Sequence, residues 1–416
     1  MKKVIIILII FSLMFISFFL FKKEEQENNK NISIILETNE GNIEASTYPD
    51  KEYYEYSNIN CKDTSDDINV NFNKETWKLN LSIEEEKVDG KFNCIVHFKQ
   101  RNRLGTEVIT SKYKENNTDG LIRLEQPETE QTPALVEYRY SGSNEEVKNY
   151  VEFNNETWRI IGVSPVDNGT GKYESKLKIM REESISGYSW DTSSTSVNSG
   201  YGINQRGESG TYEEADLMRL LNSGYSGVHG SLYWNRKNGT CYNVYNNLST
   251  HCDFSETGLT EEAKSMIGDA KWYTAISTYG ATADSSYKEE RANKVGTADT
   301  GVKVIKTFNW LGKVGLIYLS DYGYASSGCR AVEEILYNYN NTICKNTNWM
   351  YNNAYNWTLT PYFNYNDNVF TFHSDGRVNG NTTGNGYSVR PCIYLKPEVK
   401  ITSGEGTLEN PYSLSL

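Results

Sequence analysis

Apolar and polar residues alternate in short runs over the first hundred residues of the chain, after an apolar N-terminal segment. Residues 77–83 alternate in this way, as a strand with one buried face does. Asp89-Gly90 is a two-residue hairpin signal. The residues after it place four apolar side chains on one face: Phe92, Cys94, Val96 and Phe98. We therefore predict a small β-sandwich over residues 31–100, with the role of a spacer.

A polar and charged stretch separates this unit from the rest of the chain. Residues 101–134 end in a run of Glu, Gln, Thr and Pro that can neither bury apolar surface nor form a regular ladder. We interpret this stretch as a linker. A larger domain follows over residues 135–416, and its pattern predicts strands at residues 150–163, 177–180 and 302–319.

Three segments between these strands have helical periodicity. Thr211 and Glu214 form a capping box ahead of the first helix, and Thr260 caps the second, where two glutamates suit the N-terminal end of the helix dipole. The apolar positions are Leu217, Leu220 and Leu221 in the first helix, Ala263, Met266, Ile267 and Ala270 in the second, and Val332, Ile335, Leu336 and Tyr339 in the third. Strands at both ends with helices between them imply an α+β domain.

The C-terminal region, residues 356–395, has the pattern of β-hairpins. Trp357 and Leu359 mark one strand, and residues 369–373 form a second. The tetrapeptide at residues 374–377, Ser-Asp-Gly-Arg, predicts the turn that follows. A final strand is predicted over residues 387–395.

An apolar run that is interrupted only by Ser12 and Ser17 begins at Val4 and ends at Phe21, with lysines on both sides. A helix rising ~1.5 Å per residue could nearly span a hydrocarbon core of ~30 Å with such a run. The bulky residues at its end offer no cleavage site for a signal peptidase. We predict an uncleaved membrane anchor and spacer over residues 1–30. The alternative is a cleaved signal peptide and a secreted protein.

Seven cysteines indicate where the body of the protein resides. None forms a CxxC motif or lies beside a His at zinc spacing, so we predict no metal site. Six of them fall into sequence-close pairs that favour three disulfides, although sequence alone does not fix connectivity: Cys61–Cys94, Cys241–Cys252 and Cys329–Cys344. Disulfides persist in oxidising compartments, so we expect a single-pass cell-membrane protein with an extracellular C-terminal part. Cys392 is left over as a predicted free thiol.

The net charge argues against nucleic-acid binding, and the composition is unusually rich in Tyr and Asn. The net charge is −12, the pI is near 5.1, and Lys and Arg form no block. Nucleic-acid binding needs a basic footprint, so we expect no nucleic-acid partner. The 31 tyrosines and the many asparagines are unusual. An AT-rich genome would explain their overall excess, but not their local clustering.

An ordered set of motifs runs through the larger domain: F-N-N-E-T-W-R-I-I-G-V at residues 153–163, D-L-M-R-L-L-N at 216–222, G-L-I-Y-L-S-D at 315–321, W-T-L-T-P at 357–361, S-D-G at 374–376 and V-R-P at 389–391. This order resembles a bacterial domain of unknown function that ends in a W-x-L strand, a D-G turn and a V-R-P strand. That family in turn resembles the C-type-lectin-like fold, in the branch shared by sulfatase-modifying enzymes and the variable tropism proteins of diversity-generating systems. The match covers residues 135–416. The unit before it resembles the short one-disulfide β modules of Gram-positive bacterial surface proteins.

The resemblance carries no activity by itself, because fold does not imply function. A formylglycine-generating enzyme would need a pair of reactive cysteines, and here only Cys392 is left over. Calcium-dependent lectins use Glu-Pro-Asn or Gln-Pro-Asp together with Trp-Asn-Asp. The only near match, Gln126-Pro127-Glu128, lies in the predicted linker. We therefore predict no catalytic residue and no cofactor, and the sequence leaves a structural calcium open.

Several single residues have two candidate roles. Cys392 could be a nucleophile with His373 as its base, but a buried free Cys acting as a small hydrophobe is the favoured reading. Arg390 could contact an anionic ligand, whereas its place in the V-R-P motif favours a structural ion pair or a turn bond. Trp158 and Trp357 fall in predicted core strands, which favours packing over recognition.

Tyr and Asn cluster over residues 351–387, the region where the fold that this domain resembles docks its ligands. Tyr gives rigid amphipathic contact area, and Asn gives adaptable hydrogen bonds. The predicted ligand-binding residues are Phe363, Asn364, Tyr365, Asn366, Asn379, Asn381, Asn385 and Tyr387. Replacing Phe363, Tyr365 and Tyr387 together by Ala should change stability little and weaken binding strongly. The alternative is that codon usage filled exposed loops with Asn and Tyr.

These features favour a membrane-anchored binding or adhesion protein of a Gram-positive-type bacterium, with a protein or glycan as its surface ligand. Two alternatives stay open: a cell-envelope enzyme acting on glycans through paired carboxylates, and a structural surface module without a dedicated ligand. An enzyme should have a pocket in which carboxylates with shifted acidities converge. A binder should present an exposed aromatic and amide platform instead.

Overall fold

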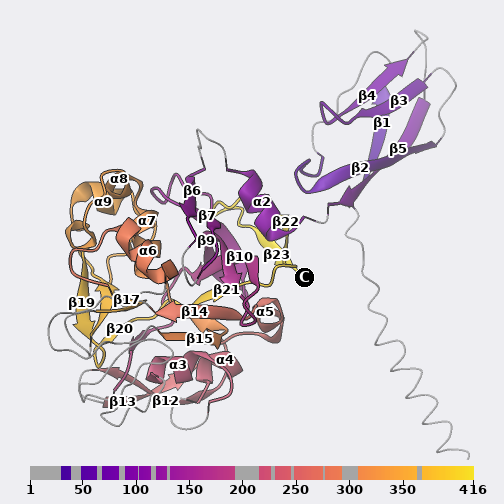
Figure 1. Ribbon diagram of the computed structural model, residues 1–416. Coiled ribbons are helices and arrows are strands. Elements are labelled where there is room, and N and C mark those ends of the chain that lie inside the picture. The colour runs from indigo at the N-terminus through magenta and orange to yellow at the C-terminus, as the bar shows by residue number, and fades with distance from the viewer. Residues whose placement is uncertain are drawn as a thin grey trace, which may run out of the picture. The chain divides into compact units, whose positions relative to one another are not determined.

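The computed structural model describes residues 30–38, 48–62, 68–83, 90–101, 103–113, 119–128, 132–192, 215–225, 230–244, 248–274, 277–292, 308–362 and 368–416. This part of the chain folds as a strand-rich α+β protein (Figure 1). It divides into two compact units, with the boundary between Asn102 and Arg103. The predicted anchor from Val4 to Phe21 lies outside the described residues. None of the described helices is long and apolar enough to cross a membrane.

The first unit consists of a three-stranded antiparallel sheet and a hairpin (Figure 1). The sheet has the order β1 (Lys30–Thr38), β5 (Gly90–Gln100) and β2 (Tyr54–Lys62), and the hairpin is formed by β3 (Ile68–Asn73) and β4 (Lys78–Ile83). Phe72 of β3 stacks on Tyr56 of β2 with ring centroids 5.0 Å apart, and it meets Phe98 of β5 edge-on at 5.3 Å. The sheet and the hairpin therefore share an aromatic core.

The predicted hairpin through Asp89-Gly90 is wrong. Asp89 lies outside the described residues, β4 pairs with β3, and β5 pairs with β1 and β2. The predicted alternation of β5 is confirmed, because every second residue from Cys94 to Phe98 is buried. Cys61 of β2 lies opposite Cys94, and the predicted disulfide joins them. Pairing with strands distant in sequence has overridden the local turn signal.

The segment 101–134 is not the predicted linker. It contains α2 (Gly105–Ser111) and β6 (Leu121–Gln126), and both belong to the second unit. Val108 and Ile109 of α2 are fully buried, and β6 pairs along its whole length with β7 (Leu135–Tyr140). Charged residues occupy the exposed positions of this edge strand, and they masked its alternation. The second unit therefore begins at Arg103 rather than at residue 135.

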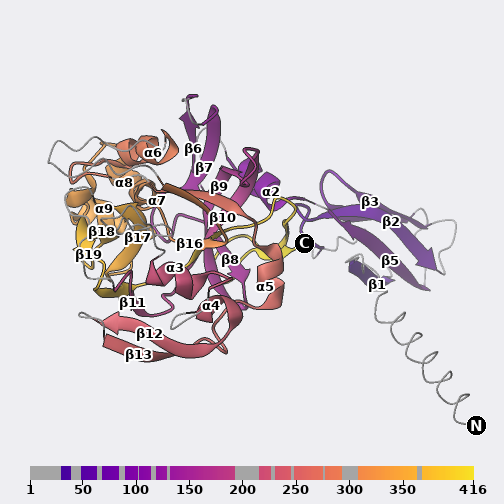
Figure 2. The same cartoon turned by 60° about the horizontal axis from the view of Figure 1, so that its bottom comes forward.

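A sheet of seven strands in the described chain forms the centre of the second unit (Figures 1 and 2). Its order is β16 (Val314–Gly315), β21 (Cys392–Tyr394), β10 (Tyr173–Arg181), β9 (Glu156–Asp167), β7 and β6, with β8 (Tyr150–Phe153) also paired to β9. The strands predicted at residues 150–163 and 177–180 are confirmed. Asn154 and Asn155 form the turn between β8 and β9 at φ 59° and 58°, a conformation that Asn tolerates better than most residues.

A second sheet combines the C-terminal hairpin with an earlier strand. Its order is β11 (Gly187–Ser189), β20 (Gly386–Ser388), β17 (Asn356–Pro361), β18 (Asn368–Phe372) and β19 (Val378–Thr382). The turn predicted at residues 374–377 is confirmed, because the backbone N–H of His373 donates to the Arg377 carbonyl at 2.8 Å. The single final strand predicted over residues 387–395 is wrong. It divides into β20 and β21 around Pro391, which has no N–H to donate, and the two pieces join different sheets.

The helices confirm two predictions and correct a third. The predicted first and second helices are α3 (Asp216–Leu221) and α5 (Glu261–Met266), and the Thr260 hydroxyl accepts the Ala263 N–H at 3.1 Å as a cap. The N-cap of α3 is Ala215, so the predicted capping box of Thr211 and Glu214, which lie outside the described residues, does not begin this helix. The second helix is shorter than predicted, because Ala270 already begins a strand. The helix predicted around Val332 is wrong, because Val332 is 69% exposed and Glu333 has a left-handed φ of 51°. Short elements replace it: α8 (Ser327–Arg330), a 3₁₀ turn η1 (Leu336–Asn338) and α9 (Thr342–Asn346). The disulfide Cys329–Cys344 ties this region together.

The strand predicted over residues 302–319 is only partly correct, because α7 (Leu319–Ala325) begins at its end. The strands found there are β15 (Phe308–Gly312) and β16. The remaining elements are α4 (Leu232–Asn235), β12 (Asn238–Val244), β13 (Leu248–Asp253), β14 (Ala270–Thr274), α6 (Ala283–Ala292), β22 (Lys400–Ser403) and β23 (Ser413–Ser415). The third predicted disulfide, Cys241–Cys252, joins β12 to β13. Helix α7 packs against α6, β7 and β17, so it lies between the two sheets.

Candidate functional site

Half of the predicted ligand-binding residues fall on one face of the second sheet. Asn379 and Asn381 lie on β19, Asn385 lies in the turn after it, and Tyr387 lies on β20. All four side chains are half-buried. The other predicted residues lie outside the described residues: Phe363, Asn364, Tyr365 and Asn366.

Three of the four described residues share one hydrogen-bond network. The Asn381 amide donates to Thr371 Oγ1 at 2.6 Å and contacts His373 Nε2 at 2.9 Å. The Tyr387 hydroxyl donates to Asn381 Oδ1 at 3.1 Å and accepts from the Asn385 amide at 3.0 Å. Asn379 stands apart from this network, because its Oδ1 accepts the N–H of the following glycine. The structure therefore brings Asn381, Asn385 and Tyr387 together.

An aromatic stack continues the network toward solvent. Tyr355, which is 37% exposed, stacks on Tyr387 at 5.0 Å with an interplanar angle of 17°, and its centroid lies 4.5 Å from that of His373. On its inner side Tyr387 lies 5.0 Å from Trp357, which is buried as predicted. The Trp357 indole donates to the Tyr188 carbonyl at 2.9 Å. We call this surface the Tyr355 face: Tyr355, His373, Asn381, Asn385 and Tyr387.

The expectation that Tyr387 is a freely replaceable exposed anchor is wrong. Its ring packs on the buried Trp357 and its hydroxyl bonds two asparagines, so its removal would disturb the core as well as the surface. The exposed ring is that of Tyr355, which the sequence prediction missed. The signal was present, because Tyr355 extends the alternation of Trp357 and Leu359 by one step and so shares their face of the strand.

The Tyr355 face carries no ionised side chain at neutral pH. Burial lowers the pKa of His373 to about 4, more strongly than the Asp375 carboxylate raises it, and Arg377 adds to the lowering. The imidazole is therefore neutral at pH 7, and the other four residues are amides and phenols. Such a surface offers hydrogen-bond donors and acceptors beside an exposed ring, without a fixed charge.

Arg390 and Cys392 have the structural roles that the sequence favoured. The Arg390 guanidinium is buried, donates to the carbonyls of Arg181 and Met350 at 3.1 and 3.2 Å, and forms an ion pair with Glu182 at 3.0 Å. Cys392 is a free, fully buried thiol, and desolvation raises its pKa to about 12. A buried protonated thiol is a poor nucleophile.

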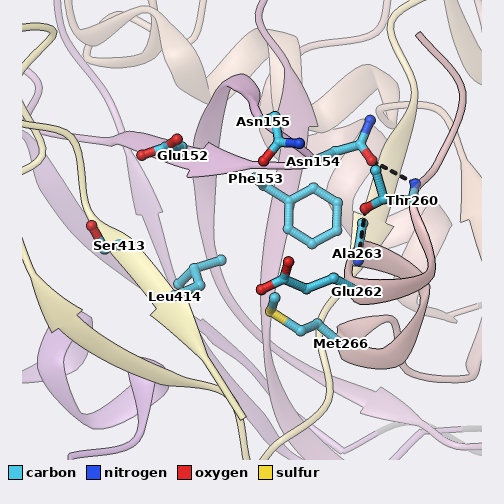
Figure 3. A pocket seen from close by; sticks show the side chains of 10 residues that line it. All are labelled: Glu152, Phe153, Asn154, Asn155, Thr260, Glu262, Ala263, Met266, Ser413 and Leu414. Carbon is cyan, nitrogen blue, oxygen red and sulfur yellow. Dashed lines mark hydrogen bonds between the residues drawn. The ribbon is translucent and has the colours of Figure 1, made fainter. Parts of the chain in front are cut away.

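A hollow of about 130 Å³ lies elsewhere in the second unit, where the β8–β9 turn, α5 and β23 meet (Figure 3). Phe153 and Met266 give it an apolar, buried lining. At its rim the Asn154 amide donates to the Gly258 carbonyl at 3.3 Å, and Asn154 Oδ1 accepts the Thr260 N–H at 2.7 Å. These polar atoms hold the turn against α5, so this part of the rim is structural.

Two exposed glutamates also line the hollow, Glu152 on β8 and Glu262 on α5. Figure 3 shows Glu262 below the Phe153 ring and Glu152 to the upper left of that ring. A glycan hydrolase needs two carboxyl groups that flank the scissile bond. Glu152 and Glu262 are therefore the residues at which the alternative function, an enzyme acting on glycans, can be tested. Among the described residues, no group of three His, Cys, Asp or Glu side chains could hold a metal ion.

No protein-family model matches this chain, and neither the curated proteins nor the solved structures contain a match to it. The resemblance to the C-type-lectin-like fold therefore stays a prediction that rests on the motifs. The Tyr355 face and the hollow are therefore the two candidate sites whose geometry bears on the function.

Proposed function

We propose that the protein is a membrane-anchored extracytoplasmic binding or adhesion protein whose second unit, a C-type-lectin-like domain, takes its ligand at the Tyr355 face. The observation that carries this proposal is the neutral network of Asn381, His373 and Tyr387 beside the exposed ring of Tyr355. Its side chains are held by one another, so little rotamer freedom remains to be lost when a ligand binds.

The chemistry of the Tyr355 face favours a glycan as the ligand. A sugar ring has an apolar C–H face, which an aromatic ring such as Tyr355 can cover, and hydroxyl groups, which amides and phenols can bond. The absence of ionised groups from the five residues favours an uncharged ligand, because a charged one would lose hydration without gaining an ionic partner among them. A protein ligand is the alternative outcome of the test below.

The cell-surface location rests on the cysteines and on the N-terminal run. The three disulfides suit an oxidising compartment, and the apolar run from Val4 to Phe21 suits a membrane anchor. In this proposal the first unit, a small sandwich of sheet and hairpin, acts as a spacer that extends the reach of the second unit from the membrane.

Binding of the full chain to glycan and protein arrays tests the proposal. Tyr355→Ala should weaken binding about tenfold or more, because an aromatic anchor in an interface often contributes ~2 kcal/mol. Tyr279→Ala is the matched control, since Tyr279 is also exposed, at 43%, and pairs with Tyr337 instead of with this network. Tyr387→Phe should also weaken binding, because it keeps the ring and deletes the hydroxyl that bonds Asn381 and Asn385.

The outcomes separate the candidate functions. Equal binding by wild type and Tyr355→Ala, with both folded, contradicts the assignment of the ligand to this face. Cleavage of an arrayed glycan that is lost in Glu262→Gln favours the envelope enzyme instead. Failure of the folded wild type to bind any arrayed glycan or protein favours the structural module.

A further inference from the structure

Two cationic side chains extend side by side from the buried face of the central sheet. Arg139 of β7 and Lys178 of β10 both lie opposite Gly162 of β9, and residues paired in this way point to the same face. Gly162 is required here, because a Cβ atom on it would lie 1.8 Å from the Tyr138 carbonyl oxygen. With no side chain between them, both cationic groups reach the same carboxylate under α7.

That carboxylate belongs to Asp321, in the first turn of α7. Arg139 Nη1 lies 3.1 Å from Asp321 Oδ1, and Lys178 Nζ lies 2.5 Å from Asp321 Oδ2. The side chains of Lys178 and Asp321 are both fully buried. Since a C–O bond is about 1.23 Å long, Nζ lies no farther than about 3.7 Å from the carboxyl carbon, close to the separation of reacting atoms before attack.

Three aromatic rings surround the fully buried amino group of Lys178. Its Nζ lies 4.3 Å from the centroid of the Tyr318 ring, 5.3 Å from that of Tyr394 and 5.9 Å from that of Trp272. Burial raises the pKa of Asp321, but the nearby charges of Lys178 and Arg139 outweigh it and hold that pKa below its ordinary value. Condensation therefore needs the transient transfer of a proton from Nζ to Oδ2, which removes two charges whose burial carries a desolvation cost. The products of that transfer, a free amine and a carboxylic acid, are the forms that condense to an amide.

Asp321 is held in a fixed orientation that suits attack on its carboxyl carbon. Oδ2 accepts the Tyr318 backbone N–H at 2.7 Å, while Oδ1 faces the Arg139 guanidinium. A guanidinium beside one carboxyl oxygen stabilises the negative charge that develops there during attack. Glu137 is fully buried and pairs with Arg139 at 3.0 Å, which makes it a positioning residue for the guanidinium.

We propose that Lys178 and Asp321 condense to form an intramolecular isopeptide bond between β10 and α7. One proton first moves from Nζ to Oδ2 along the existing hydrogen bond. The free amine then attacks the carboxyl carbon, and negative charge develops on Oδ1 beside Arg139. The C–Oδ2 bond breaks, and Oδ2 leaves as water with a second proton from the nitrogen. The amide nitrogen keeps one hydrogen, and no oxidant or cofactor is consumed.

The bond would join residues that are 143 positions apart in the chain. It would fix the central sheet to the helix that lies between the two sheets, independently of any ligand. Unlike the three disulfides, an amide withstands thiol reductants. The cross-link would therefore persist where the disulfides are reduced.

Intact mass spectrometry of the full chain, reduced and denatured after folding, tests the proposal. The wild type should be lighter than its sequence by about 18 Da, the mass of one water. Peptide mapping should recover a branched peptide joined at Lys178 and Asp321, with no tryptic cleavage after Lys178. Wild type at the full sequence mass, or a mass deficit mapped to any other site, overturns the proposal, and the pair is then an ordinary buried ion pair.

Variants separate the cross-link from the ion pair. Lys178→Met should have its full sequence mass, whereas Lys176→Met, a matched change of another buried lysine on β10, should keep the deficit. Asp321→Asn should yield the same cross-linked product as the wild type, because its side-chain amide releases ammonia where the acid releases water. A wild-type deficit that persists in Lys178→Met also overturns the proposal. Glu137→Gln should slow the formation of the cross-link during refolding. If Glu137 has a purely structural role, the substitution should lower stability and leave the extent of cross-linking in folded protein unchanged.

Discussion

Arg390→Met removes a guanidinium that ties three segments of the second unit together. Arg390 is only 4% exposed and serves the Arg181 carbonyl at the end of β10, the Met350 carbonyl ahead of β17, and the Glu182 carboxylate. Met has a similar length and no donor. The variant therefore leaves two carbonyls and one carboxylate without the donor that they had.

The loss of stability can be bounded from these contacts. Removing one partner of a buried ion pair usually costs ~3–5 kcal/mol, and a single hydrogen bond to a charged group contributes ~1.5–3 kcal/mol. Glu182 is 26% exposed and keeps a second contact, to Arg159 at 3.5 Å. Both facts reduce the penalty for the carboxylate. We expect a loss of ~3 kcal/mol, a large fraction of the ~5–15 kcal/mol that stabilises a typical protein.

Urea denaturation followed by tryptophan fluorescence measures this loss. Arg390→Lys should lose less than Arg390→Met, because Lys keeps the charge and cannot serve all three acceptors at once. Arg377→Met is the control, since the ion pair of Arg377 with Asp375 is about one-third exposed on both sides and should contribute less than ~1 kcal/mol. A loss below ~1 kcal/mol for Arg390→Met, together with lost ligand binding, would refute this reasoning and make Arg390 a ligand contact.

Three further changes have defined outcomes. The free energy of unfolding should be full above about pH 6.5 and fall toward pH 4, because His373 binds a proton in the unfolded chain that it does not bind in the native protein. The expected loss is roughly 1–2 kcal/mol after allowance for solvent screening. Urea titration at several pH values should show this loss in the wild type and not in His373→Gln. Iodoacetamide should leave Cys392 unlabelled in native protein and label it in denaturant, as mass spectrometry would report. Asn154→Ala should lower stability by ~1–2 kcal/mol and Asn154→Asp by less, because Ala loses both side-chain bonds and tolerates the left-handed conformation poorly.

Features that depend on neighbouring residues could be predicted from the sequence. The Thr260 cap needs only the N–H of Ala263, three residues later, and the turn at residues 374–377 needs only its own tetrapeptide. The three disulfides join the cysteines that are closest in sequence. In each case the physical cause lies within a short stretch of chain, so the pattern contains it.

Features that depend on pairing with strands distant in the sequence could not be predicted. The β5 strand, which begins at Gly90, pairs with β1 and β2 rather than with β4, so the Asp89-Gly90 signal predicted the wrong partner. The β6 strand has charged residues at its exposed positions and was interpreted as a linker, although it pairs with β7 along its whole length. Turn and polarity signals describe the local chain, whereas strand pairing decides which side of it water can reach.

The Tyr355 face shows the same division. Asn381 and Tyr387 could be chosen from the sequence because Asn and Tyr gather in this region, and the structure places them in one network. The position of each ring could not be chosen, since Tyr387 turns toward Trp357 while Tyr355, outside the predicted set, takes the exposed place. Composition predicts a candidate region, but burial decides which aromatic ring in it is exposed.

The buried charges of the central sheet mark the limit of pattern reading most clearly. Glu137 and Arg139 on β7, and Lys176 and Lys178 on β10, alternate with less polar residues as though they faced water. They are buried instead. Helix α7 covers Arg139 and Lys178 and brings Asp321 to within 2.5 Å of Lys178, Glu137 pairs with Arg139, and Lys176 donates to the Asp269 carbonyl. Alternation with a period of two shows which residues share one face of a strand. It does not show whether that face meets water or packs against residues of opposite charge. Only the fold of a segment 143 residues later supplies that neighbour, so the chemistry proposed for Lys178 could be found only in three dimensions.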